Sequence, residues 1–429
     1  MKLFKHQEDA LEQTKNRNKV AYYLDMGLGK TFVGAEKMMQ LKNGVNLVVC
    51  QKSKVQDWLN HFDEYYDCRL YDLTNKKDLF NFLNDVLHPD VPSIGIINYD
   101  LIFRRPQFKQ LQNFTMMLDE SSLIQNSKTK RSKFILGLNP SNVILLSGTP
   151  TSGKYENLWT QIHLLDWTIS QDTYNKQYIN WTLTEDDGSG IRHKIVDKND
   201  PYKNVDRLKS KLREHGAVFM KTEECFDLPE QTFITVNCGS SKEYKKFKKD
   251  SVITIKTDSG EIELIGDSTL TKMMYLRMLC GQYNEEKLES FKDLAESTQD
   301  RLIVFYNFNE ELNQLKRIAS ELERPISEVN GHVKDLDAYE NEDNSITYVQ
   351  YQAGSMGLNL QKANKIIYFT PTLKCEEWMQ SQKRIHRINQ TKTCFYYQLV
   401  CKSSIEEDIY KTLQKGVDYT NELFVEVSQ

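Results

Sequence analysis

Four residues near the start of the chain have the types and spacing needed to bind phosphate. In the stretch YYLDMGLGKTF (residues 22–32), Gly27 and Gly29 precede Lys30 and Thr31. Glycines let backbone N–H groups approach an anion at a helix N-terminus, the lysine adds a positive charge, and the threonine hydroxyl can ligate Mg²⁺. The usual pattern has one more glycine where this chain has Leu24, so the stretch by itself also fits a simple turn.

An acidic pair follows a short apolar run later in the chain. Asp119 and Glu120 come directly after TMML (residues 115–118). One carboxylate can hold Mg²⁺ while the next orients and deprotonates a water molecule. Such pairs are common on solvated surfaces, but this one ends a strand that we expect to be buried, which favours a hydrolytic site.

A third candidate is the segment LLSGTP (residues 145–150), where Ser147, Gly148 and Thr149 leave another apolar run. Small hydroxyl residues at this position could sense a γ-phosphate, although a strand that ends in a proline-containing turn has the same appearance. Ligands gather at the carboxyl ends of parallel strands, so three such segments in this order indicate one site on one sheet.

Arginines near the C-terminus could complete that site. Gln380, Arg384 and Arg387 are spaced i, i+4 and i+7, which predicts one face of a helix. A guanidinium that reaches a γ-phosphate can raise the rate of hydrolysis by about 10³ to 10⁵. A solvated basic face is the alternative, but the glycine-containing segment 353–364 at the end of a predicted strand favours the functional interpretation.

The elements that must position these residues are short buried strands. Apolar runs without polar alternation recur in two groups, and they predict two α/β lobes with parallel sheets. Because the phosphate-binding candidates and the arginines fall in different groups, we expect the ATP site in the cleft between the lobes. The first group comprises residues 46–50, 93–98, 115–120 and 143–148, and the second comprises 301–308, 345–351, 365–370 and 394–401. We therefore expect an N-terminal lobe (1–165), a helical insertion and linker (166–230) and a C-terminal lobe (231–429), with an exposed turn at 184–190 and a hairpin or disordered loop within 256–269.

Composition narrows the class of protein further. Hydrophobic residues make up 39% and charged residues 27% of the 429 residues, and no apolar run approaches the roughly 18 residues of a membrane span. The eight cysteines show no metal-binding spacing. We expect a cytoplasmic protein without a targeting segment. Because the net charge is only −4, a polyanionic partner must be held by local clusters.

The order of these motifs resembles that of superfamily 2 helicases and translocases, and within them the Swi/Snf-type DNA-dependent ATPases with two RecA-like lobes. In the first lobe the resemblance rests on FKHQEDAL, DMGLGKT, NLVVCQKSKVQDWLNHF, IINYDLI, LDESS and LSGTPTSGKYENLW. In the second lobe it rests on KLESFKDL, LIVFYNF, EVNGH, GSMGLNLQKANKIIYF, QSQKRIHRINQTK and SSIEEDIY. It covers almost the whole chain.

The resemblance implies a role for each matching residue. The catalytic residues would be Lys30, Asp119, Glu120, Arg384 and Arg387; ATP would be bound by Gln7, Asp25, Gly27, Gly29, Lys30, Thr31, Gly357 and Gln380; and Mg²⁺ would be bound by Thr31 and Asp119. The DNA backbone would be contacted by Lys52, Ser53, Asn98, Tyr99, Asn330, Gly331, His332 and Gln352. The lysine-rich segment KEYKKFKK (242–249) is a separate candidate for binding phosphate, or a solvated helix face.

The chain departs from the family pattern at three places. Ser122 replaces the histidine of the acidic box, Gln51 replaces a proline, and Gln350-Tyr351-Gln352 replaces Ser-Thr-Arg. The histidine's link between hydrolysis and the DNA-facing motifs must therefore be made by other residues or more loosely, whereas ATPase activity should be retained.

The resemblance implies a minimal, monomeric bacterial or phage motor that hydrolyses ATP to translocate on DNA, preferably duplex, in replication, recombination or repair. A strand-separating DNA or RNA helicase is the alternative enzyme. A clamp that binds nucleic acid without hydrolysing ATP is the alternative of another class, but degenerate motors usually lose one of the catalytic residues, and this chain retains them all.

Overall fold

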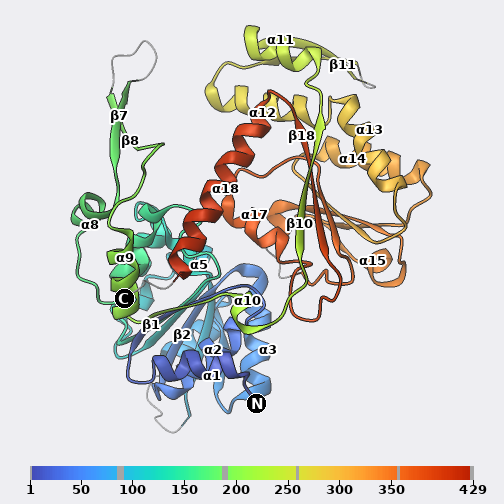
Figure 1. Cartoon of the computed structure of the whole chain (residues 1–429). Coiled ribbons are helices and arrows are strands. Elements are labelled where there is room, and N and C mark those ends of the chain that lie inside the picture. Colours follow the sequence, from blue (N-terminus) through green and yellow to red (C-terminus); the bar gives the residue numbers. More distant parts are fainter. Residues whose placement is uncertain (1, 85–90, 186–191, 258–259, 355–357, 426–429) are drawn as a thin grey trace. The chain divides into compact units, whose positions relative to one another are not determined.

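The computed structural model describes residues 2–84, 91–185, 192–257, 260–354 and 358–425, which form two compact units (Figure 1). The first unit contains residues 1–225 and the segment that begins at Asp418, and the second contains residues 226–417. Among the described residues, no helix has both the length and the apolar character of a membrane span.

The first unit is built on a sheet of seven parallel strands in the order β3-β4-β2-β5-β6-β1-β9. The strands are β1 (Lys19–Leu24), β2 (Val45–Cys50), β3 (Arg69–Asp72), β4 (Ser93–Asn98), β5 (Thr115–Asp119), β6 (Asn142–Leu146) and β9 (Ala217–Met220). Strands β2, β4 and β6 are buried along their whole length. This burial explains why they read as continuous apolar runs.

Helices connect these strands. They are α1 (Lys5–Gln13), α2 (Lys30–Gln40), α3 (Val55–Tyr65), α4 (Lys76–Asn84), α5 (Tyr99–Ile102), α6 (Lys130–Leu136), α7 (Trp159–Leu164), α8 (Gln171–Tyr178), α9 (Val205–Glu214) and α10 (Thr222–Cys225). Four short 3₁₀ segments are η1 (Lys52–Lys54), η2 (Pro106–Gln110), η3 (Ser121–Ile124) and η4 (Tyr155–Leu158), and a hairpin is formed by β7 (Trp181–Glu185) and β8 (Arg192–Val196).

The segment expected as an insertion and linker differs from the prediction. Residues 166–225 belong to the first unit, because β9 pairs in parallel with β1 and extends the sheet by one strand. Of the predicted turn at 184–190, residues 184 and 185 lie in β7, and residues 186–190 lie outside the described part of the chain.

The second unit contains a sheet in the order β10-β18-β17-β13-β16-β14-β15, in which only β15 is antiparallel to its neighbour. The strands are β10 (Gln231–Cys238), β13 (Leu302–Tyr306), β14 (Ile326–Val329), β15 (Lys334–Asp335), β16 (Ile346–Gln350), β17 (Lys365–Tyr368) and β18 (Cys394–Cys401). Along β13, Val304 and Tyr306 pack into one apolar cluster while Ile303 and Phe305 pack into another. The sheet is therefore buried on both faces.

The helices of this unit are α11 (Lys242–Asp250), α12 (Thr269–Cys280), α13 (Glu285–Glu296), α14 (Asn309–Glu321), α15 (Asp337–Asn341), α16 (Tyr351–Gly354), α17 (Cys375–Gln382) and most of α18 (Ile405–Phe424). The two predicted groups of strands are confirmed, and so is the hairpin alternative for 256–269. The hairpin consists of β11 (Val252–Thr257) and β12 (Gly260–Ile265), and only β11 begins earlier than expected.

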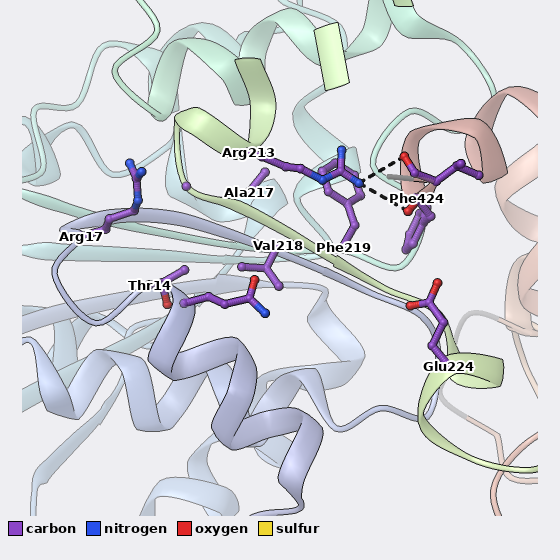
Figure 2. Close-up of a pocket in the computed structure, with 11 residues that line it drawn as sticks. Thr14, Arg17, Arg213, Ala217, Val218, Phe219, Glu224 and Phe424 are labelled. Atoms are coloured by element: carbon purple, nitrogen blue, oxygen red, sulfur yellow. Dashed lines mark hydrogen bonds between the residues drawn. The ribbon is translucent and has the colours of Figure 1, made fainter. Parts of the chain in front are cut away.

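The last turns of α18 belong to the first unit, where polar contacts hold them. Lys209, which is 2% exposed, places its Nζ 2.8 Å from Oε1 of Glu422. Arg213 donates to the carbonyls of Phe424 and Val425, as Figure 2 shows. A cation at this position satisfies carbonyls that a helix C-terminus leaves without partners, and it interacts favourably with the helix dipole.

Candidate functional site

The loop between β1 and α2 has the backbone conformation that an anion-binding loop requires. Gly27 and Gly29 have φ angles of 90° and 73°, in the left-handed region that favours glycine. Gly29 is the N-cap of α2, so the first N–H groups of the helix, starting at Lys30, have no partner within the helix. The predicted phosphate loop therefore lies at the carboxyl end of β1 and at a helix N-terminus.

Gln7 packs directly on this loop. Its Nε2 donates to the carbonyl of Leu28 at 3.1 Å, and its Oε1 accepts from the N–H of Phe4 at 3.0 Å. A Cβ added to Gly29 would lie 2.2 Å from Nε2 of Gln7. The structure thus brings two residues predicted to bind ATP into contact.

This contact gives the first prediction. Gly29→Ala should destabilise the protein by about 2 kcal/mol, because an alanine is strained at this φ and its methyl group overlaps the Gln7 amide. Urea unfolding measures the loss. Gly44→Ala is the matched control, since nothing lies within 4 Å of a Cβ at that glycine. Equal stability of the two variants would contradict the prediction.

Lys30 and Asp25 tie the loop to its surroundings. Nζ of Lys30 donates to the Leu24 carbonyl at 3.1 Å and lies 3.2 Å from the position of a Cβ on Gly148. Oδ2 of Asp25 accepts from the hydroxyl of Thr222 at 2.9 Å. Lys30 therefore lies between the phosphate loop and the LSGTP segment, whereas Asp25 anchors the loop to α10.

The acidic pair lies on a neighbouring part of the same sheet edge. Asp119 ends β5, which pairs with β6, and its Oδ2 accepts from the indole N–H of Trp58 at 2.9 Å. Burial raises the pKa of Asp119, while the hydrogen bond from Trp58 and the charge of Lys30 act in the opposite direction. Lys30 and Asp119 thus interact electrostatically within one site.

Glu120 follows with a strained backbone. Its φ is 54°, a left-handed conformation that is uncommon for residues other than glycine and clusters at functional sites. The hydroxyl of Tyr99 donates to the carbonyl of Asp119 at 2.9 Å and thereby supports this turn. The turn directs the chain out of the strand immediately after the metal-binding candidate.

Two side chains that sequence reasoning missed hold the site together. Trp58 lies in the segment that follows β2, and Gln161 lies on α7, and both are buried. Trp58 lies in the segment NLVVCQKSKVQDWLNHF, which resembles the family, but was given no role in the site, and the spacing of Gln161 signals no site. The observation that could have identified them is polarity at positions that helical periodicity places in the core.

The arginines are not on a helical face, so this prediction was wrong. Helix α17 ends at Gln382, and Arg384 and Arg387 lie in the turns that follow. Ile385 and His386 are buried there, and the Nε2 of Gln390 donates to the carbonyl of Ile385. The chain after Gln382 therefore forms packed turns and does not continue as a helix.

The two arginines also differ in their environments. Arg384 is 8% exposed and its Nη1 donates to the carbonyl of Leu358 at 3.3 Å. Arg387 is half-buried, and within the described residues its guanidinium has no hydrogen bond or ion pair. Burial lowers the pKa of Arg387. Gln380 is buried and donates to Glu376, and Gly357 lies outside the described residues.

The predicted nucleic-acid contacts fall into exposed and buried sets. Lys52 and Ser53 are exposed on η1, and Gly331, His332 and Gln352 are exposed in the second unit. Asn330 shapes its turn by accepting from the N–H groups of His332 and Val333 at 2.8 Å. Asn98 and Tyr99 are only 3% and 2% exposed, and such burial argues against direct contact with DNA. Their DNA contacts stay predictions.

The lysine-rich segment forms helix α11. Tyr244 and Phe247 are buried at 2% and 0% exposure, and the Tyr244 hydroxyl accepts from the N–H of Ile405. The aromatic residues therefore fix the helix to its lobe and are not available for stacking on bases. Four exposed lysines occupy the opposite face, at spacing i, i+3, i+4 and i+7: Lys242, Lys245, Lys246 and Lys249.

A cavity of about 510 Å³ in the first unit lies elsewhere, at strand β9 (Figure 2). Its lining includes Thr14, Arg17, Arg213, Phe219 and Glu224. None of the residues predicted to bind ATP lines it, so this cavity is distinct from the candidate site.

The donor set at the edge of the first sheet fits a nucleoside triphosphate with Mg²⁺. Gly29 and Gly148 let the Gln7 amide and the Lys30 ammonium group approach the backbone closely, and the hydroxyl of Thr149 is buried without a hydrogen-bond partner among the described residues. A carboxylate, a hydroxyl and an ammonium group are present together. These are the ligands that the metal and the phosphates of such a substrate prefer.

Comparisons with known proteins agree with this geometry. Residues 17–285 match the family model described as the SNF2-related domain. The chain is 23% identical over 90% of its length to a SWI/SNF-related matrix-associated actin-dependent regulator of chromatin, subfamily A member 1, from Mus musculus, and 20% identical over 94% of its length to an uncharacterized ATP-dependent helicase of Mycoplasma genitalium.

The chain spans 39% and 40% of the lengths of these two relatives. Among solved structures, it is similar to the Sulfolobus solfataricus SWI2/SNF2 ATPase core in complex with double-stranded DNA. That comparison has a TM-score of 0.45 and 18% sequence identity, and it covers 99% of this chain and 94% of the other.

Proposed function

Because the chain belongs to the family of the SNF2-related domain, we propose that it hydrolyses ATP and uses the energy to translocate along DNA, preferably duplex DNA. The observation that carries the proposal is the gathering of Lys30, Asp119 and the LSGTP segment at one edge of the first sheet. These groups supply a phosphate cradle and a carboxylate site within one lobe.

We assign a role to each residue of the proposed site. The N–H groups at the start of α2 and the ammonium group of Lys30 bind the phosphates. Asp119, oriented by Trp58, and the hydroxyl of Thr31 would hold Mg²⁺, which when bound neutralises charge on the phosphates. Glu120 orients the attacking water and accepts its proton. Arg387 stabilises the negative charge that develops on the γ-phosphate.

The DNA track is expected to be bound through its backbone. The exposed candidates Lys52, Ser53, His332 and Gln352 are suited to phosphate contacts, which fix register without reading sequence. We place the motor in DNA replication, recombination or repair in a bacterial or phage-infected cell. The resemblance to bacterial ATP-dependent helicases over 94% of the chain supports that setting.

One experiment tests the proposal against its alternatives. ATP hydrolysis is measured with duplex DNA, single-stranded DNA, RNA and no nucleic acid, and duplex DNA should stimulate the rate most. Equal rates under all four conditions would exclude a translocase, and binding of DNA without any hydrolysis would identify a clamp. Separation of a labelled duplex in a parallel assay would favour the strand-separating alternative.

The lysine face of α11 gives a prediction about the same track. Replacing Lys242, Lys245, Lys246 and Lys249 by glutamine should lower the slope of log affinity for duplex DNA against log salt by about 3 to 4, because each lost phosphate contact removes about 0.9. These four lysines lie within about 10 Å along one helix, and like charges at this spacing destabilise a helix that has no polyanion beside it.

The matched control removes four positive charges from exposed lysines of the first unit. Lys2, Lys5, Lys176 and Lys203 are exposed there, and their replacement by glutamine should leave the slope nearly unchanged. If both quadruple variants lower the slope equally, the effect comes from whole-protein charge and α11 is only a solvated face.

A further inference from the structure

A single buried amide joins the three segments of the candidate ATP site. Gln161 is 0% exposed, and its Oε1 accepts from the hydroxyls of Ser121 at 2.7 Å and Tyr23 at 3.1 Å. Its Nε2 donates to the carbonyl of Pro150 at 2.7 Å. The amide therefore contacts Tyr23 in β1 and two residues in the segments that leave β5 and β6, Ser121 and Pro150.

Each contact lies next to a residue of the proposed chemistry. Ser121 directly follows Glu120, and Pro150 ends the LSGTP segment. Tyr23 lies in β1, just before the phosphate loop. A displacement of the backbone at Ser121 or Pro150 is thus transmitted to the other through one rigid amide group.

The chemistry of the three partners fixes the orientation of the amide. Burial raises the pKa of Tyr23, so its phenol keeps its proton and donates. The carbonyl of Pro150 can only accept, so the NH₂ group must face it and the amide oxygen must face the two hydroxyls. Because all these groups are buried, a lost hydrogen bond cannot be replaced by bulk water.

We infer that Gln161 is a positioning residue that couples the acidic pair to the LSGTP segment during ATP hydrolysis. The inference rests on the proposed ATP hydrolysis and deepens it, because it assigns to this chain a connection between the catalytic acids and a neighbouring loop.

The test compares two substitutions in one helix. Gln161→Leu removes all three hydrogen bonds at similar volume, and kcat for ATP hydrolysis should fall by about 100-fold while KM for ATP stays within about twofold, because a small misplacement of the acids slows chemistry more than binding. Thr160→Val is the control. Thr160 is 1% exposed, and its hydroxyl has no hydrogen-bond partner in the part of the chain that the structure describes, so kcat should be unchanged.

A double substitution separates coupling from general damage. Ser121→Ala should lower kcat on its own, and Ser121→Ala with Gln161→Leu should be no slower than Gln161→Leu alone, since both remove one link. Three results would each overturn the inference. They are a double variant whose loss of kcat is the product of the two single losses, a parental kcat for Gln161→Leu, and a loss of kcat in Thr160→Val as large as that in Gln161→Leu.

Hydrogen exchange keeps this test separate from that of the proposed function. In Gln161→Leu the amides of residues 119–123 and 147–152 should exchange faster than in the parental protein and in Thr160→Val. If the parental chain hydrolyses no ATP, the proposed function fails while the structural link is still measured. If exchange in these segments is unchanged, the link itself is absent and the inference fails.

Discussion

Replacing Glu120 by glutamine should lower kcat for ATP hydrolysis by about 10³-fold, because a general base of this kind contributes about 10² to 10⁴ to the rate. The substitution preserves the size of the side chain, so the left-handed turn at Glu120 and the support of Asp119 by Tyr99 should survive. ATP affinity should change little, because the phosphates are held by Lys30 and the loop before it. Steady-state hydrolysis and nucleotide binding measure the two effects.

The control for this substitution is Glu64→Gln, which removes the same charge from an exposed position on α3. It should hydrolyse ATP at the parental rate. Lys30→Ala should also abolish turnover, but through weakened nucleotide binding as well as slower chemistry, since its ammonium group lies beside Gly148 and the phosphate loop. A parental rate for Glu120→Gln would show that the catalytic base is a different residue.

Arg387→Ala should lower kcat by about 10³-fold or more while leaving the free energy of unfolding nearly unchanged. The reason is structural: Arg387 is half-buried and has no hydrogen bond or ion pair among the described residues, so folding does not depend on it. Arg387→Lys should remain slow, because an ammonium group lacks the planar fork that binds two phosphate oxygens.

Arg384→Ala provides the contrast. Arg384 is 8% exposed and donates to the Leu358 carbonyl, so its removal should destabilise the protein by about 2 kcal/mol in urea unfolding. The sequence treats the two arginines as equivalent, whereas their environments predict one catalytic and one largely structural residue. If Arg387→Ala retains the parental kcat, or if it unfolds as readily as Arg384→Ala, this distinction is wrong.

The strands that sequence patterns identified share one property. β2, β4, β6 and β13 are buried on both faces, and such strands must be apolar at every position, which a single sequence displays directly. β10 was missed because it is an edge strand whose burial alternates along QTFITVNC. β9 was missed because it has only four residues and gains its place by pairing with β1, far away in the sequence.

The chemical groups of the site could be predicted from the order of residues along the chain. The order of Gly29, Lys30, Asp119-Glu120 and the LSGTP segment, each after an apolar strand, sufficed to predict a phosphate site at the carboxyl edge of one parallel sheet. This works because the carboxyl ends of parallel strands share an edge. Residues that leave those ends come together whatever the details of packing.

How those groups are held depends on contacts between elements that are distant in the sequence. The end of α17 at Gln382 depends on the packing of Ile385 and His386, which helical periodicity does not contain. The contacts of Gln161 with Ser121 and Pro150 join segments that are 40 and 11 residues away along the chain. Spacing reveals which side chains share a face of one element, but hydrogen bonds between elements depend on how the elements pack, and that packing is set by the whole core.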